Sequence, residues 1–196
     1  MNNNKIKIII LAAGKGNRMQ NELPKVLMPV GGKPMIERLL ESVGKSGIGD
    51  HPVVVVGYKK EEVMKELGNN YEYAVQEEQL GTGHAIMSTE NLLKGNTDNV
   101  MVLPSDHPFI TEETIKKLAE RHLESGAKIT MATTKLPDFK DWRFAFYTSF
   151  SRIIRDESGR IVRDVQFRDA TEEEKKIKEV NPIFFCFGAK WLWKNL

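Results

Sequence analysis

Several features that would mark a specialised class of protein are scarce in this sequence. A single cysteine, Cys186, excludes an internal disulfide and favours a reducing compartment. The 29 Lys and Arg residues nearly balance 27 Asp and Glu residues, and the net charge of +2 gives no field to attract nucleic acid or a membrane surface. No apolar run approaches the ~20 residues that a membrane-spanning helix needs. We therefore expect a cytoplasmic protein that binds neither nucleic acid nor membrane; the oligomeric state stays open.

What the sequence does contain is typical of one globular domain. Its 196 residues are 40% apolar and 29% charged, which is ordinary for a soluble enzyme. Over the first two thirds, short runs of Ile, Val, Leu and Met alternate with amphipathic stretches, which predicts parallel strands joined by crossover helices. The expected strands are residues 6–11, 52–56, 99–103 and 128–132, and the expected helices are 35–45, 61–67, 83–93 and 112–125. Thr111 and Thr114 resemble a capping box at the start of the last of these helices.

The pattern changes in the last third of the chain. Strands are expected at residues 144–149, 151–155, 160–167 and 183–187, with a turn at 157–160 and a short polar helix at 171–178. These short elements predict a small antiparallel lobe. The complete expectation is a Rossmann-like α/β fold with a mostly parallel sheet, flanked by helices and followed by this lobe.

The loop after the first expected strand is the most informative segment. It reads Leu11-Ala12-Ala13-Gly14-Lys15-Gly16-Asn17-Arg18-Met19. Small residues at the carboxyl end of a parallel strand allow backbone N–H groups to approach an anion, and Lys15 and Arg18 add positive charge. Neither a dinucleotide fingerprint nor a Walker A motif is present, because Met19 replaces the third glycine and no Gly-Lys-Ser/Thr follows. The residues alone thus indicate a phosphate-binding loop or an ordinary turn.

Three further residues have the chemistry of a phosphate-transfer site. Pro24 stiffens the chain before Lys25, whose ammonium is a point charge suited to a phosphoryl group. Asp106 follows a buried strand, where a carboxylate suits Mg²⁺ or caps the next turn. Gln76 carries both a donor and an acceptor, as recognition of a pyrimidine edge requires. Each residue also has an ordinary structural explanation when taken alone.

Taken together, the glycine loop and Pro24-Lys25 resemble the signature of the sugar-1-phosphate nucleotidyltransferases, with Asn17 in place of the usual Thr. The resemblance extends to the pyrophosphorylase domain of bacterial N-acetylglucosamine-1-phosphate uridyltransferases over residues 6–192. Its further landmarks are Val75-Gln76-Glu77-Glu78-Gln79-Leu80-Gly81-Thr82-Gly83-His84-Ala85, Asp169-Ala170-Thr171-Glu172-Glu173 and Glu179-Val180-Asn181.

This resemblance implies roles for individual residues. Arg18 and Lys25 would be catalytic, and Asp106 would bind Mg²⁺ as cofactor. The nucleotide would be bound by Leu11, Ala12, Ala13, Gly14, Gly16, Gln76, Gln79, Gly81 and Thr82. The sugar would contact Ser151, Gln166 and Asn181. The whole chain would be a single nucleotidyltransferase domain, with a nucleotide-binding part over about residues 1–135 and a sugar-binding part over about 136–196.

The sugar side departs from the family pattern. Ser151 stands where the family has Gly, Gln166 where it has Glu, and Asn181 is followed by Pro182 rather than Thr. The family also takes a second metal ligand, an Asn, from beyond the last residue of this sequence. Another group then completes the metal shell, or the metal site is partial, or the chain is shortened at its C-terminus.

The sequence predicts an enzyme that transfers UMP from UTP to N-acetylglucosamine 1-phosphate or a related sugar phosphate and releases pyrophosphate. One alternative is a nucleotidyltransferase with another substrate pair, such as glucose 1-phosphate as acceptor, or CTP with a phosphorylated alcohol. The other is a nucleotide-sugar-binding regulatory module without turnover, which Ser151 and Gln166 favour and the retained Arg18, Lys25 and Asp106 oppose.

Overall fold

The structure is a computed structural model that describes residues 5–16, 23–49, 51–141 and 143–196, apart from the side chain of Phe146. The chain divides into two compact units. Unit 1 comprises residues 1–130 and 185–196, and unit 2 comprises residues 131–184. Each unit is described below by itself. Within the described residues, no helix is long and apolar enough to cross a membrane.

The sheet of unit 1 is the predicted parallel sheet. Its strand order is β5-β4-β1-β6, followed by the last residues of β10. All pairs are parallel except β6 with β10, which is antiparallel. The four valines of β4 are completely buried, and most residues of β1 and β6 are buried, because helices cover both faces. The strands are β1 (Ile6–Leu11), β4 (Val53–Val56), β5 (Glu72–Val75), β6 (Asn99–Pro104) and β10 (Glu179–Gly188).

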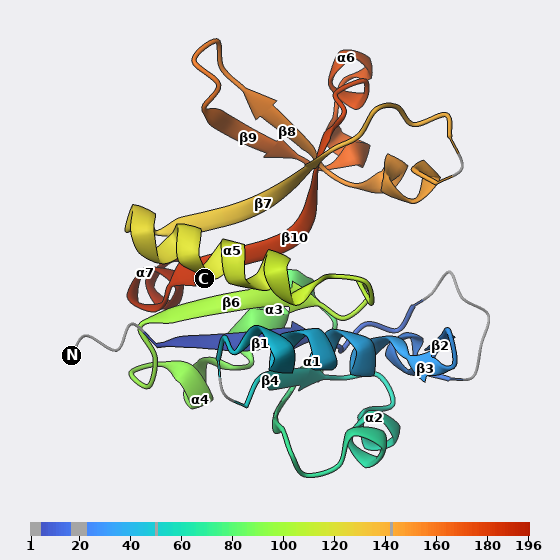
Figure 1. Cartoon of the computed structure of the whole chain (residues 1–196), viewed down its shortest axis with the longest axis vertical. Coiled ribbons are helices and arrows are strands. Elements are labelled where there is room, and N and C mark those ends of the chain that lie inside the picture. The colour runs from blue at the N-terminus through green and yellow to red at the C-terminus, as the bar shows by residue number, and fades with distance from the viewer. Residues whose placement is uncertain (1–4, 17–22, 50, 142) are drawn as a thin grey trace. The chain divides into compact units, whose positions relative to one another are not determined.

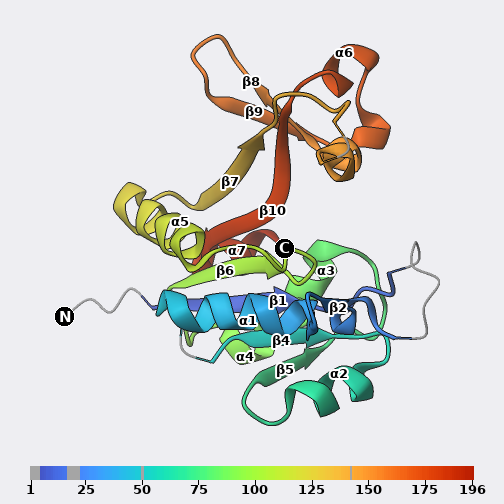
Figure 2. The same ribbon diagram turned by 45° about the vertical axis from the view of Figure 1, so that its right-hand side comes forward.

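Helices cover both faces of this sheet (Figures 1 and 2). On one face, Ile9 and Val102 pack in a core with residues of α3, α4 and α7, while α1 and α5 lie together on the other face. Successive side chains of a strand point to opposite faces, so Ile8 and Ile10 face away from Ile9. The helices are α1 (Met35–Ser46), α2 (Lys60–Leu67), α3 (Thr82–Met87), α4 (Glu90–Leu93), α5 (Glu112–Ser125) and α7 (Ala189–Asn195).

Two parts of unit 1 differ from the sequence expectation. The single helix expected over 83–93 is wrong: α3 and α4 are separate, because Thr89 donates its hydroxyl to the Ile86 carbonyl and interrupts the helix. Strand β5 was not expected, and neither was the short pair β2 (Pro29–Val30) and β3 (Lys33–Pro34). The pair follows the 3₁₀ helix η1 (Lys25–Leu27).

Unit 2 contains the predicted antiparallel strands. Strand β8 pairs antiparallel with both β9 and β10. The strand expected over 144–149 is wrong, because this segment is the 3₁₀ helix η2, held by bonds such as Tyr147 N–H to the Phe144 carbonyl at 3.0 Å. The elements are β7 (Ile129–Lys135), η2 (Ala145–Ser149), β8 (Arg152–Arg155), β9 (Ile161–Val165), η3 (Phe167–Asp169) and α6 (Glu172–Lys175), followed by β10.

Arg152 organises the interior of unit 2. Its side chain is completely buried, lies 4.5 Å from the ring centre of Phe139 and 5.1 Å from that of Phe167, and donates to the carbonyls of Thr148, Phe150 and Lys175. Carbonyl acceptors and aromatic faces replace the water that a guanidinium loses on burial. Arg152 thus holds the Thr148 carbonyl of η2 and the Phe150 carbonyl directly after it, which favours the 3₁₀ helix over a strand at residues 145–149.

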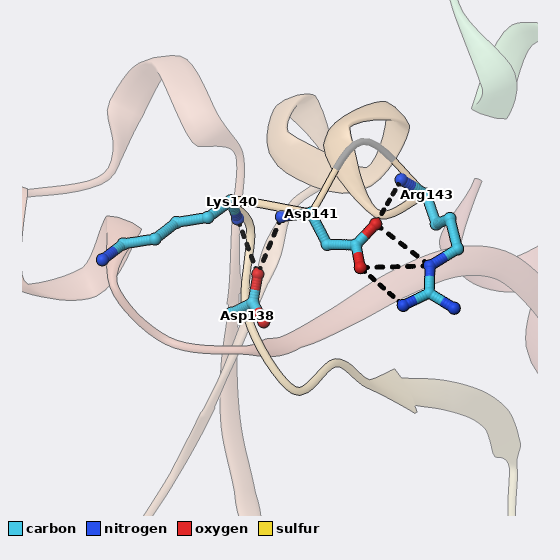
Figure 3. Close-up of polar contacts among 4 residues, drawn as sticks. All are labelled: Asp138, Lys140, Asp141 and Arg143. Atoms are coloured by element: carbon cyan, nitrogen blue, oxygen red, sulfur yellow. Dashed lines mark hydrogen bonds and ion pairs between the residues drawn. The ribbon is translucent and has the colours of Figure 1, made fainter.

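Hydrogen bonds of two aspartates shape the loop between β7 and η2 (Figure 3). Asp138 Oδ1 accepts from the backbone N–H groups of Lys140 and Asp141, at 2.7 and 2.9 Å. These two bonds lower the pKa of Asp138. Asp141 in turn pairs with Arg143, which lowers the pKa of Asp141 as well. The loop is thus held by local bonds from side chains to backbone and between side chains.

Candidate active site

The carboxyl ends of β1, β4, β5 and β6 meet at one edge of the unit 1 sheet. The Leu11 carbonyl accepts from the N–H of Ser105 at 3.1 Å and from its hydroxyl at 2.7 Å. Ala12 N–H donates to the Val55 carbonyl at 2.9 Å. The loop that begins at Leu11 is therefore fixed to β4 and β6 at the edge where open α/β sheets bind ligands.

Gly16 lets the loop pack against the segment that carries Lys25. A Cβ on Gly16 would lie 2.8 Å from the Cβ of Lys25, and the residue has φ +65°, a left-handed conformation that favours glycine. Lys15 Nζ lies 5.4 Å from the ring centre of Tyr58. The structure thus places Gly16 and Lys25 together, whereas Arg18 lies outside the described residues.

Lys25 and Asp106, which come from distant parts of the sequence, form an ion pair. Lys25 Nζ lies 2.7 Å from Asp106 Oδ2, and the two side chains are 31% and 32% exposed. Lys25 begins η1 directly after Pro24, and Asp106 follows β6. A cation and a carboxylate that remain accessible at the end of a buried strand can both contact a charged ligand.

His107 follows Asp106 and is mostly buried. Burial lowers its pKa, the charge of Asp106 opposes this, and Lys25 adds to it. The imidazole is therefore neutral at pH 7. The cation beside Asp106 is Lys25, which comes from η1.

Gly57 belongs to this edge and was not recognised from the sequence. It follows β4, and a Cβ there would lie 2.9 Å from Ala13 Cβ and 3.0 Å from the carbonyl oxygens of both Ala13 and Gln76. Such contacts are closer than side chains tolerate. Tyr58 N–H also donates to the Ala13 carbonyl at 3.2 Å. A glycine directly after a buried parallel strand is the signal that could have found it.

Gln76 is held by the loop that follows it. Its side chain is buried, and its amide nitrogen donates to the Gly81 carbonyl and to His84 Nδ1, each at 3.1 Å. Gln79 is exposed and reaches the Gln76 carbonyl at 3.4 Å. Gly81 has φ +113°, where only glycine is unstrained, and Thr82 begins α3. The predicted base-binding residues thus form one connected loop.

In unit 2, the three residues predicted to bind sugar lie at corresponding ends of adjacent strands. Ser151 precedes β8, Gln166 follows β9, and the Arg152–Val165 pair brings these ends together. Asn181 N–H donates to the Ser151 carbonyl at 3.3 Å. Ser151 and Asn181 are buried, whereas Gln166 is exposed. Asn181 Nδ2 also donates to Asp164 Oδ2 at 2.6 Å, so an aspartate that was not predicted joins this group.

The described residues offer few ligands for a metal ion. Among them, no cluster of three or more His, Cys, Asp or Glu side chains could hold one. A lone accessible carboxylate such as Asp106 still fits Mg²⁺, since this ion keeps several waters and is commonly bound by one or two carboxylates together with substrate phosphates.

A glycine-rich loop and an accessible lysine–aspartate pair at the carboxyl edge of a parallel sheet suit a phosphorylated ligand. The chain belongs to the MobA-like NTP transferase domain family, which it matches over residues 8–170. This membership confirms the expected enzyme class and the expected fold class.

Curated relatives support the same family. The chain is 44% identical over 188 residues to the bifunctional protein GlmU of Thermoanaerobacter pseudethanolicus, a match covering 96% of this chain and 39% of that protein. The corresponding protein of Enterococcus faecalis is 42% identical, with the same coverage. The chain thus resembles the pyrophosphorylase domain of GlmU, as the sequence predicted, and spans about two fifths of the length of these relatives.

Solved structures share the fold. A putative glucose-1-phosphate thymidylyltransferase from Bacillus anthracis has a TM-score of 0.76 at 20% identity, covering 97% of this chain and 75% of that one. A CMP:2-keto-3-deoxy-manno-octonic acid synthetase complexed with CTP has a TM-score of 0.70 at 15% identity, covering 97% and 76%. At these identities the likeness is one of fold.

Proposed function

We propose that this nucleotidyltransferase transfers UMP from UTP to N-acetylglucosamine 1-phosphate or a related hexosamine phosphate. The observation that carries the proposal is the Lys25–Asp106 pair at 2.7 Å, beside a glycine loop and at the same sheet edge as Gln76. The choice of nucleotide and acceptor rests on the resemblance of residues 6–192 to the N-acetylglucosamine-1-phosphate uridyltransferases.

In the proposed reaction, a phosphate oxygen of the sugar 1-phosphate attacks the α-phosphorus of UTP. A new P–O bond forms, the bond between the α- and β-phosphates breaks, and pyrophosphate leaves. The protein contributes mainly positioning and charge stabilisation. Lys25 neutralises charge on the phosphates, Arg18 is proposed for the same role, and the backbone of Gly14 and Gly16 holds the triphosphate.

Mg²⁺ is the proposed cofactor, with Asp106 as its protein ligand. When bound, this ion supplies positive charge for the phosphates. Lys25 forms an ion pair with the same carboxylate. The two side chains therefore present a cation and a metal-binding anion next to each other, where the triphosphate would bind. In unit 2, Ser151, Gln166 and Asn181 are proposed to contact the sugar. The proposed location of the protein is the cytoplasm.

Pyrophosphate release tests this function directly. The purified protein is incubated with UTP, Mg²⁺ and a panel of sugar 1-phosphates, then with CTP, ATP and GTP in place of UTP. We expect release with UTP and a hexosamine 1-phosphate. Release only with glucose 1-phosphate, or only with CTP and a phosphorylated alcohol, would move the assignment to that substrate pair. Nucleotide-sugar binding without release would instead support the regulatory module.

Lys25→Ala and Asp106→Ala test the site itself. Each should lower kcat by about 100-fold or more, because each removes an electrostatic stabiliser of the transferring phosphate. Lys117→Ala is the matched control, since Lys117 is also an ion-paired lysine but pairs with Glu113 on the exposed side of α5. Near-normal activity of both Lys25→Ala and Asp106→Ala would remove the pair from the catalytic site.

A further inference from the structure

Both donors of the Gln76 side-chain amide are engaged within the protein. The nitrogen donates to the Gly81 carbonyl and to His84 Nδ1, each at 3.1 Å. A carbonyl oxygen can only accept, so the amide nitrogen, not its oxygen, must face Gly81. His84 Nδ1 must then accept as well, which requires the proton of the neutral imidazole to be on Nε2.

The amide oxygen of Gln76 is the atom left for a ligand. Among the described residues, no group donates to this oxygen, and the only fully buried polar side-chain atom without a partner is Trp193 Nε1. The oxygen of Gln76, on a side chain that is otherwise buried, is therefore the acceptor left at the sheet edge that carries Lys25 and Asp106. It can accept one hydrogen bond and cannot donate any.

We propose that His84 is a positioning residue that fixes the orientation of the Gln76 amide and thereby selects uracil over cytosine. This inference rests on the proposed function. Uracil presents N3–H, a donor, where cytosine presents N3 as an acceptor. The amide oxygen of Gln76 can accept a hydrogen bond from the N3–H of uracil, whereas it repels the N3 lone pair of cytosine. Rotating the amide by 180° would reverse the preference, and the acceptor on His84 opposes that rotation.

The local structure keeps His84 in this role. His84 is the third residue of α3, half-buried, and its neighbours Ala85 and Ile86 pack in the core of unit 1. The backbone N–H of Ala85 donates to the Gly81 carbonyl at 3.1 Å, so the same carbonyl anchors both the helix and Gln76. Removing the imidazole thus leaves Gln76 with one of its two acceptors, rather than releasing the whole loop.

Three variants test the inference by the ratio of kcat/KM for UTP to kcat/KM for CTP. His84→Leu removes the acceptor and should lower this ratio by about 10-fold, because a lost or reversed hydrogen bond to the base weakens discrimination. His84→Lys replaces the acceptor with a donor and should lower the ratio further. His84→Asn keeps an oxygen near the place of Nδ1 and should retain most of the ratio.

The kinetic signature separates positioning from a general structural defect. In His84→Leu, KM for UTP should rise while kcat changes less than about threefold, since His84 contacts Gln76 and not the phosphates. Circular dichroism and the thermal midpoint confirm that each variant folds; if His84→Leu does not fold, His84→Lys and His84→Asn decide the question. A ratio within threefold of wild type in the folded acceptor-free variants would overturn the inference.

A measurement without substrate distinguishes this inference from the proposed function. The side-chain NH₂ signal of Gln76, assigned by its loss in Gln76→Glu, should shift and exchange faster with solvent in His84→Leu but not in His84→Asn. An unchanged signal in His84→Leu would overturn the positioning role. If the signal shifts in His84→Leu but the wild-type protein turns over neither UTP nor CTP, the positioning role is retained and the proposed function is rejected.

Discussion

At the scale of single residues, the site depends on close packing of backbone as much as on charged groups. Gly57 shows this most directly, because its neighbours leave no room for a side chain: Ala13 Cβ would be 2.9 Å from an added Cβ, and the Gln76 carbonyl oxygen 3.0 Å. These neighbours belong to the glycine loop and to the loop that carries Gln76. Gly57 therefore sets the spacing between the proposed phosphate and base contacts.

Gly57→Ala should lower both stability and activity. The added methyl must displace backbone on two sides, which costs about 1–3 kcal/mol of unfolding free energy. The measurement is urea unfolding followed by circular dichroism, together with KM for the nucleotide, which should rise. Gly44→Ala is the matched control: Gly44 is exposed inside α1 with no atom within 4 Å of an added Cβ, and alanine there should stabilise by about 0.5–1 kcal/mol. Equal stability of the two variants would contradict the packing argument.

At the scale of elements, the N-terminus of α5 shows how a side chain sets the start of a helix. Thr111 lies just before α5 with an extended backbone, and its hydroxyl accepts from the Thr114 N–H at 3.2 Å. The expected cap is therefore present, although the reciprocal bond of a full capping box occurs instead at Thr171 and Glu174 of α6. Ile115 and Leu118 of α5 are buried, so this start fixes the register of a core helix.

Thr111→Ala should lower the free energy of unfolding by about 1 kcal/mol, because one backbone N–H loses its acceptor. Thr111→Ser keeps the oxygen and should stay close to wild type. Urea unfolding of both variants measures the difference. A loss of stability in Thr111→Ser as large as in Thr111→Ala would show that the methyl group of Thr111, and not its hydroxyl, stabilises α5.

The elements also show how far the sequence alone could lead. Strand β1 and helix α5 have the predicted bounds, because a continuous apolar run and a clear helical period each have one stable arrangement. Strand β5 escaped detection since only Ala74 of its four residues is buried, so the segment lacks an apolar run. Residues 144–149 carry strand-like aromatics, yet they form a 3₁₀ helix whose Thr148 carbonyl, with that of Phe150 just after it, accepts from the buried Arg152. That contact belongs to tertiary structure.

The same reasoning applies to the site. Lys25 and Asp106 were identified because a resemblance placed both, and the structure brings them to 2.7 Å. The packing of Gly57 and the hydrogen bond of His84 became visible only in the structure, since their partners lie outside their own elements: Ala13 for the first and Gln76 for the second. The local sequence indicates the chemistry that a side chain offers. The residues that it contacts depend on how the chain folds.

At the scale of the whole molecule, each unit contains a buried titratable group that makes stability depend on pH. In unit 1, His122 lies between Thr130 Oγ1 at 2.8 Å and Asn99 Oδ1 at 3.1 Å, and burial lowers its pKa below 6.5. In unit 2, Glu179 accepts from Arg155 and Thr133, and these bonds lower its pKa from 4.5 to about 2. The two groups titrate in different pH ranges, so the pH at which stability is lost distinguishes the contribution of His122 from that of Glu179.

His122 should make unit 1 less stable as the pH falls below about 6.5. In that range the unfolded chain binds a proton that the folded protein excludes, so stability is complete above the unfolded pKa and declines toward the folded one. The variant is His122→Gln, which cannot titrate. Urea unfolding from pH 8 to 5 should show a smaller slope for the variant than for wild type, and parallel curves would contradict a buried neutral imidazole.

Glu179 should act in unit 2 at lower pH. Because its folded pKa is about 2 and its ordinary value 4.5, its contribution is complete above pH 4.5 and is lost as the pH falls toward 2. The contribution is at most about 3 kcal/mol, since lowering a pKa by one corresponds to about 1.4 kcal/mol. Glu179→Gln keeps the shape of the side chain but removes its charge, so it should be less stable than wild type at pH 7, and the difference should shrink between pH 4.5 and 2. A difference that stays constant over this range would show that the ion pair of Arg155 with Glu179 adds nothing to the free energy of unfolding. The packing of the Glu179 side chain alone would then stabilise unit 2.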